Sequence, residues 1–229
     1  TWIKRQIQPS GLVMSNIGDA DANGWAFTYD QAIAAQALMS AGEVKTAQII
    51  LNAAYRDIPR RLGAQITAVK AINAAGAEWV VHIGPNLHLG IAALQLNAKI
   101  PSPQNMAIAR EKADFAILLQ DNDSKHVAYG GIAMGPRGEK ANLKDQHLGW
   151  DESAPGYWQI YSTEHNLDAY LLFNWLYSLT KQEKYRQAAQ KVKGFLKKVY
   201  DKKIHAFYAG YRETEGLDRK IPADAQAWA

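Results

Sequence analysis

The sequence predicts an all-α fold built from stacked helical hairpins, and two observations support this prediction. The first is that two kinds of helix alternate along the chain: helices that are apolar nearly all round, and helices with one apolar and one polar face. The second is that short and long connections alternate between them. A helix that is apolar all round must be enclosed by others, so we call the first kind inner and the second kind outer.

The inner helices are expected at "YDQAIAAQALMSA", "NLHLGIAALQL" and "NLDAYLLFNWLYSL", and a further one begins at "PADAQAWA". The outer helices are expected around 44–54, around 106–116 and over 183–201. In the last of these Tyr185, Ala188, Val192 and Phe195 recur at helical spacing, with lysines and glutamines between them. The sequence therefore predicts six helices and the start of a seventh, an order typical of an α/α solenoid or toroid.

The lengths of the connections distinguish the two ends of this helical array. Inner-to-outer connections are short, near Gly42, over 99–103 and over 180–183, whereas outer-to-inner connections are long, over 59–83, 122–156 and 202–221. The long loops, or small β-hairpins within them, must then lie where the inner helices begin. Long loops on a rigid scaffold usually carry function, so this end, which we call the mouth, is the candidate site.

Composition limits the class of protein. The chain of 229 residues is 48% apolar, which is enough for a core, and we expect one domain over residues 1–229. The formal charge is +4, and the lysines are concentrated in "KVKGFLKKVYDKK", which we interpret as a solvated helix face because it lacks the interleaved exposed aromatics of a nucleic-acid site. The absence of cysteine excludes disulfides and thiolate chemistry. No apolar run reaches the ~18 residues of a membrane span, so we expect neither nucleic acid nor a membrane span.

The chain begins at Thr1 rather than at a methionine. This indicates processing or excision from a longer chain, so any signal peptide is out of view. The sequence leaves the compartment open, with export to the periplasm or the outside as one alternative.

Polar residues stand in the first turn of each inner helix. They are Thr28 and Asp30, then Asn86 and His88, then Glu164, His165 and Asp168, and finally Asp224 and Gln226. Some of them have a simple structural explanation, because Thr, Ser, Asp and Asn cap helix N-termini. Glu164 and Asp168 are harder to explain in this way, since residues four apart share one face of a helix that is otherwise apolar. They either have buried partners or face a wet cavity.

Carboxylates and aromatic residues together suit glycan chemistry. Glycoside hydrolysis uses one protonated and one ionised carboxyl group, set ~5 to 9.5 Å apart. The mouth also carries aromatic residues on which sugar rings stack, although each of them could instead pack beneath its own loop. They are Trp25, Trp79, Trp150, Tyr157, Trp158 and Tyr161. From these we select Trp79, Trp158 and Tyr161, with Asp168, as candidate substrate-binding residues.

Several segments resemble a known family. "AFTYDQAIAAQALMSAGE", "GPNLHLGIAAL", "STEHNLDAYLLF" and "ADAQAWA" are similar to bacterial six-hairpin glycosidase-like proteins, the (α/α) toroid superfamily. That superfamily includes glycoside hydrolases, unsaturated-uronide hydrolases and sugar epimerases. The resemblance runs from about Gly11 to the end. A complete toroid has twelve helices, so the resemblance implies a partial ring, truncated at the C-terminus.

The resemblance also implies roles for individual residues. Glu164 corresponds to an acidic residue that opens an inner helix and becomes the candidate general acid. Asp30 is the candidate base, with Asp224 as its competitor. His165 is expected to orient one of them, and Asn86 to bind a sugar hydroxyl.

We therefore expect an enzyme, a glycoside hydrolase acting on a bacterial polysaccharide or its oligosaccharides. The alternatives are a non-catalytic glycan-binding or protein-interaction scaffold of the same fold, and a sugar epimerase in which histidines serve as bases. We expect no cofactor and no metal, because the histidines lack metal-binding spacing: there is no H-E-x-x-H, and His82 and His88 lie six apart. We also expect the chain to self-associate through apolar flanks.

Overall fold

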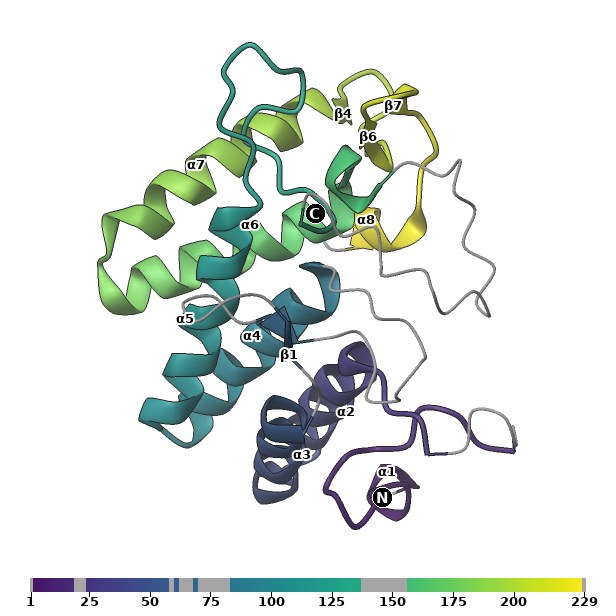
Figure 1. Cartoon of the computed structure of the whole chain (residues 1–229), viewed down its shortest axis with the longest axis vertical. Helices are drawn as coiled ribbons and strands as arrows, with labels where there is room; N and C mark the ends of the chain where they lie inside the picture. Colours follow the sequence, from purple (N-terminus) through teal and green to yellow (C-terminus); the bar gives the residue numbers. More distant parts are fainter. Residues whose placement is uncertain are drawn as a thin grey trace.

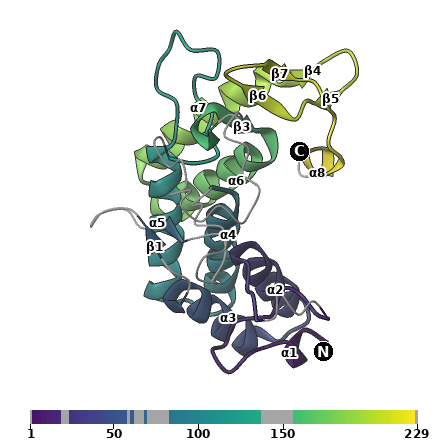
Figure 2. The ribbon, with the colours of Figure 1, turned by 45° about the vertical axis from the view of Figure 1, so that its right-hand side comes forward.

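The computed structural model describes residues 2–18, 24–57, 60–61, 68–69, 83–136 and 156–227. It contains three helical hairpins, α2 (Thr28–Ser40) with α3 (Val44–Asp57), α4 (Ile83–Lys99) with α5 (Pro103–Leu118), and α6 (Thr163–Thr180) with α7 (Glu183–Lys198). Figures 1 and 2 show them stacked along the long axis of the molecule. A short helix α8 (Ala223–Ala227) follows, and α1 (Trp2–Arg5), which the sequence pattern does not predict, precedes them.

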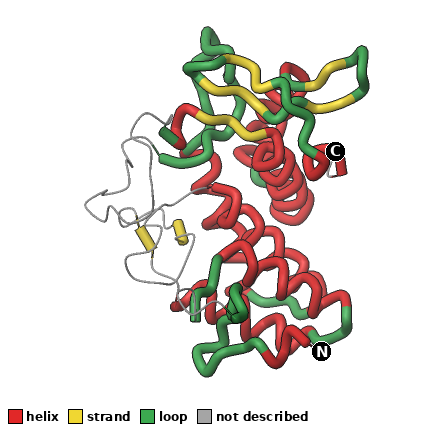
Figure 3. Tube along the Cα trace, turned by 90° about the vertical axis from the view of Figure 1, so that its right-hand side faces the viewer, coloured by secondary structure: helices red, strands yellow, loops and turns green. Residues whose placement is uncertain are grey.

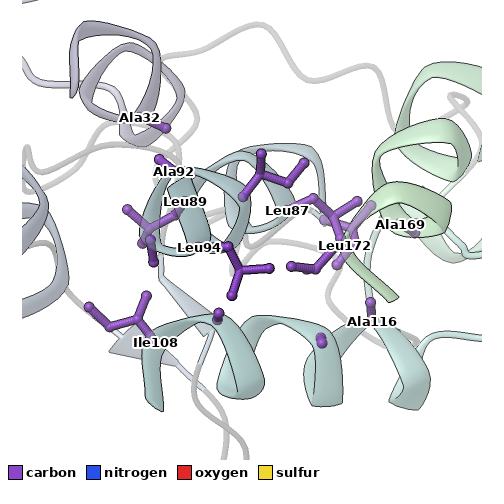
Figure 4. Close-up of a cluster of buried hydrophobic side chains, with 14 of the residues drawn as sticks. Ala32, Leu87, Leu89, Ala92, Leu94, Ile108, Ala116, Ala169 and Leu172 are labelled. Carbon is purple, nitrogen blue, oxygen red and sulfur yellow. The ribbon is translucent and has the colours of Figure 1, made fainter. Parts of the chain in front are cut away.

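The predicted alternation of helices is confirmed. The inner helix α4 is buried along almost its whole length, and it contacts α2, α3, α5 and α6. Figure 4 shows this packing, with leucines of α4 pointing toward α5 and toward Leu172 of α6. The outer helix α7 buries only one face, through Tyr185, Ala188, Ala189, Val192, Phe195 and Leu196.

The connections also follow the predicted pattern. The hairpins α2–α3, α4–α5 and α6–α7 turn within a few residues, at Gly42, at 100–102 and at Lys181. Helix α7 ends at Lys198, three residues earlier than the periodicity predicts, because Tyr200–Asp201 form strand β4, which pairs with β5 (Ala206–Phe207). The described helices include none that is long and apolar enough to cross a membrane.

A small antiparallel sheet positions the start of α6. Its strand order is β3 (Ile160–Ser162), β6 (Gly210–Arg212) and β7 (Gly216–Asp218), and Figure 3 shows these strands at one end of the molecule. A further pair, β1 (Arg60–Arg61) and β2 (Ala68–Val69), lies elsewhere. Ser162, the last residue of β3, is also the residue before α6, and it pairs with Gly210. The sheet therefore fixes the direction in which α6 begins.

Glycine is required at position 210. Its φ is +148°, and a Cβ atom built there would lie 2.1 Å from the carbonyl oxygen of Tyr161. Any other residue would strain the backbone and push β3 away from β6. The close approach of these two strands thus depends on one residue.

Candidate functional site

The first turns of the inner helices meet in one cluster of ionisable side chains. Glu164 and Asp168 lie one turn apart on α6, Asp30 stands in the first turn of α2, and Asp224 stands in the first turn of α8. Asp168 is 1% exposed, whereas Glu164 and Asp30 are partly buried and Asp224 is exposed. The cluster therefore extends from the interior to the surface.

A histidine of α4 contacts the buried carboxylate. His88 Nε2 lies 3.2 Å from Asp168 Oδ2, and the two side chains are only 2% and 1% exposed. Within the described residues Asp168 Oδ2 has no aligned hydrogen bond, so this close contact is chiefly electrostatic. A buried carboxylate is costly unless it is paired, and His88 supplies the pairing group.

Tyr29 covers the histidine. Its ring meets the His88 ring edge-to-face, with centroids 4.7 Å apart and an interplanar angle of 77°. Burial raises the pKa of Tyr29, and the charges of Glu164, Asp168, Asp30 and Asp224 raise it further. Tyr29 thus stands within the field of carboxylates from α2, α6 and α8.

Glu164 holds its proton more strongly than an ordinary glutamate. Burial raises its pKa, and so do the negative charges of Asp224 and Asp168 and a hydrogen bond that it shares with Asp224. The charge of His88 acts in the opposite direction and lowers the pKa. A carboxylic acid that keeps its proton to a higher pH is better suited to donating that proton.

The same atoms are close enough to surround a cation. Donor atoms of His88, Glu164 and Asp168 lie within 4.8 Å of one another, and one histidine with two carboxylates is a donor set that divalent metals accept. His88 Nε2 and Asp168 Oδ2 also face each other at 3.2 Å, and Asp224 acts on the pKa of Glu164. These contacts let the same group of side chains act on the Glu164 proton.

Helix capping accounts for little of this arrangement. Neither α2 nor α6 begins with a side-chain capping hydrogen bond, although Ser162 occupies the capping position of α6. Asp224 Oδ1 accepts a hydrogen bond from the backbone N–H of its neighbour Ala225 at 2.7 Å. Asp224 is thus an acidic first-turn residue with a local contact to its own helix backbone.

Two further predicted residues lie near the start of α4. His165 packs against Gly84, where a Cβ atom would lie 2.4 Å from His165 Nε2. The missing side chain of Gly84 thus lets α6 approach α4 beside Glu164. Asn86 is 0% exposed, so it lies beneath the mouth rather than at its surface.

Of the selected aromatic residues, Trp158 and Tyr161 lie apart from the carboxylate cluster. Trp79 is outside the described residues. Trp158 and Tyr161 line a separate cavity of about 560 Å³, whose lining includes none of the clustered carboxylates. Tyr161 is 5% exposed, and its hydroxyl donates to Asp121 Oδ2 at 3.4 Å. Its ring therefore packs within the fold.

A larger cavity adjoins the cluster. It has a volume of about 1110 Å³, and its lining includes Asp168, Gln226, Tyr170, Tyr200 and Phe207. The cluster thus has space for a ligand beside it, with aromatic rings in the walls.

Tyr29 and His88 belong to the site, but the sequence did not lead us to select them. Tyr29 directly precedes Asp30, and a tyrosine in an inner helix looks like a core residue. His88 carried a clearer signal, because it is a titratable residue within a helix that is apolar nearly all round. A buried histidine of this kind requires a partner, and the neighbouring inner helix offers Asp168.

Comparisons with known proteins agree with this architecture. No family model matches the chain, and no curated protein matches its sequence. Among solved structures, a D-mannose isomerase superposes with a TM-score of 0.73 at 15% identity, over 99% of this chain and 59% of its own length. The α-mannanase BT2949 of Bacteroides thetaiotaomicron, of family GH76, gives 0.73 at 14% identity, over 99% and 59%.

A third similar structure contains a bound sugar. It is an inactive variant of an α-1,6-mannanase from Salegentibacter sp. HEL1_6 in complex with α-1,6-mannotriose, with a TM-score of 0.66 at 14% identity, over 94% of this chain and 55% of that one. These likenesses show that the chain has the six-hairpin glycosidase-like (α/α) toroid fold, as a partial ring. The chain spans about three fifths of the length of the first two structures.

Proposed function

We propose that this chain is part of a carbohydrate-active enzyme that hydrolyses a glycosidic bond, with Glu164 as the general acid. The observation that carries the proposal is the environment of Glu164. Burial and the negative charges of Asp224 and Asp168 raise its pKa, as the proton donor of a glycosidase requires. The toroid fold supports the substrate class, because similar structures include α-mannanases.

We assign the base to Asp30 rather than to Asp224. Asp224 lies close enough to Glu164 to raise its pKa by charge and by hydrogen bonding, whereas the two carboxyl groups of a catalytic pair are separated by ~5 to 9.5 Å. Asp30 stands in the first turn of α2 beside Tyr29, and it is partly exposed. Asp224 then serves to keep the proton on Glu164.

The test is hydrolysis by the longest native form of the protein. Oligosaccharides, beginning with α-1,6-linked mannooligosaccharides, are incubated with the protein and with its Glu164→Gln and Glu183→Gln variants, and the release of reducing sugar is measured. Glu183 is an exposed glutamate paired with Arg186 on α7, so its variant is the matched control. Glu164→Gln should abolish turnover while sugar binding is kept, and unchanged turnover in this variant would overturn the assignment.

Sugar epimerisation or isomerisation is the second candidate. A histidine, His165, directly follows Glu164 in the sequence, and one of the similar structures is a D-mannose isomerase. This chemistry would give a product of unchanged mass, with solvent deuterium incorporated at the reacting carbon. Binding of a glycan without any change to it would instead support the non-catalytic scaffold.

A further inference from the structure

We infer that His88 is a positioning residue, which, held by Asp168 beneath Tyr29, fixes the carboxyl group of Glu164 for proton donation. This inference rests on the proposed role of Glu164 as the general acid. It assigns a function to a residue that cannot itself reach a sugar, because His88 is only 1% exposed. His88 therefore acts through its neighbours.

The contacts of His88 join three inner helices. Its own helix is α4, its Nε2 lies 3.2 Å from Asp168 Oδ2 of α6, and its ring packs against the Tyr29 ring of α2. Donor atoms of His88, Asp168 and Glu164 lie within 4.8 Å of one another. A displacement of His88 would therefore change the surroundings of Glu164 and the packing against α2 at the same time.

Packing of the core does not explain the buried pair of His88 and Asp168. Replacing a buried ion pair by apolar side chains of similar volume is often neutral or stabilising, and α4 is apolar almost throughout. A leucine at position 88 and another at position 168 would suit this core. The ionisable pair instead lies beside the one carboxyl group whose proton matters to the proposed reaction.

The charges around Glu164 give opposite predictions for the two members of the pair. The charges of Asp224 from α8, Asp168 from α6 and His88 from α4 act on Glu164, and the charge of Glu164 acts in turn on Tyr29 of α2. Asp168 raises the pKa of Glu164 and His88 lowers it. His88→Gln should therefore move the pKa of Glu164 upward, Asp168→Asn should move it downward, and the double variant should fall between them.

The experiment measures the Glu164 carboxyl group directly. The ¹³C resonance of the Glu164 side chain is titrated without substrate in the native protein, in both single variants and in the double variant, in which two neutral hydrogen-bonding side chains face each other. His126→Gln is the control, because His126 also pairs with an aspartate, Asp121, and this pair lies outside the cluster. Opposite shifts in the single variants, with none in the control, are the expected result.

Kinetics then separate positioning from folding. We expect His88→Gln to lower kcat about 10- to 100-fold, the effect of a small misplacement of a reacting group, with KM changed by less than about 2-fold. The alkaline limb of the pH profile of kcat should move to higher pH, because a general acid works only while it is protonated.

The titration of Glu164 and the kinetics distinguish a failure of this inference from a failure of the proposed function. Equal titration of Glu164 in all four proteins, or the same loss of kcat in His126→Gln, would overturn the inference. If no sugar is turned over by the native protein, the proposed function fails, and opposite shifts of the Glu164 resonance would still support the coupling of His88 to it. If His88→Gln does not fold, the double variant replaces it, and a native kcat in that variant would contradict a role for the pair.

Discussion

Glu164 keeps its proton to a higher pH in the folded chain than in the unfolded one. A group whose pKa is raised by folding contributes stability that is fully present below its unfolded pKa and is lost as the pH rises through the folded value. Above the unfolded pKa of glutamate, the ionisation of Glu164 therefore costs more in the folded chain than in the unfolded one, and the fold loses stability. Such a cost is common where a side chain is arranged for activity.

This gives a prediction for stability. Glu164→Gln should raise Tm at pH 7 to 8, because the variant has no charge to bury, and the gain should vanish below about pH 4, where glutamate is protonated in both states. Thermal melts followed by circular dichroism over this pH range provide the measurement, with Glu183→Gln as the control. A gain that is the same at every pH would show that the effect is not electrostatic.

The two aspartates beside Glu164 should respond differently to salt. Asp224 is exposed and Asp168 is buried, and salt screens exposed charges far more than buried ones. Both Asp224→Asn and Asp168→Asn should lower the pKa of Glu164 and so move the alkaline limb of activity to lower pH. Raising the salt from 0.05 to about 1 M should reduce the shift for Asp224→Asn more than the shift for Asp168→Asn, and an equal response of both would contradict this.

At the scale of single residues, the sequence predicted part of the carboxylate cluster around Glu164. Glu164 and Asp168 were found because a spacing of four residues places two carboxylates on one face of an apolar helix. His88 and Tyr29 were not selected, because their importance comes from contacts between helices that no local spacing reveals. Trp158 and Tyr161 carried the right chemistry for a sugar site, but they line a different cavity.

The reason for the placement of Tyr161 lies in strand geometry, at the scale of the elements. Tyr161 is directly opposite Tyr211 across the β3–β6 pair, and paired residues share one face of a sheet. That face turns toward His126 and Phe195. The sequence predicts small β-hairpins in these loops but not their register, and a shift of one residue would reverse every side chain.

Strand β6 gives a sharp test at this scale. Gly210→Ala should cost at least about 2 kcal/mol, because the backbone would be strained and Cβ would meet the carbonyl oxygen of Tyr161. Gly194→Ala is the matched control, since position 194 is helical and a Cβ there meets nothing within 4 Å; it should stabilise by up to about 1 kcal/mol. Urea denaturation measures both, and equal effects would disprove the close approach of β3 and β6.

On the scale of the whole molecule, the order of inner and outer helices could be predicted from the sequence. A helix buried all round and a helix buried on one face differ in the spacing of their apolar residues. Helix α4 shows this most clearly. The sequence could not reveal how closely the hairpins approach. That depends on positions such as Gly84 and Gly90, where a Cβ atom would meet His165 of α6 at 2.4 Å and Leu172 of α6 at 3.1 Å.

The face formed by α6 and α7 leads to a prediction about association. Leu171 and Leu179 of α6 are 41% and 52% exposed, and Leu171 lines the cavity of about 1110 Å³. Exposed apolar surface of this kind promotes association. We expect the sedimentation coefficient of the 229-residue chain to rise with concentration, and Leu171→Ser with Leu179→Ser to reduce the rise.

The control for this prediction is Ile49→Ser. Ile49 of α3 is 54% exposed, and it lies on a different hairpin, so this variant should sediment as the native chain does. A chain that stays monomeric at every concentration would contradict the prediction. Loss of association in Ile49→Ser alone would place the contact on the first hairpin.

The β3–β6 pair also has a consequence for the time course of folding. Each helical hairpin closes through a short turn, and such local contacts form quickly, whereas pairing Ser162 with Gly210 must wait until the intervening chain has been ordered. During synthesis, Glu164 therefore emerges well before the segment that fixes the start of its helix and before Asp224. The acid acquires its final surroundings late, after the helices that carry it have already found their core.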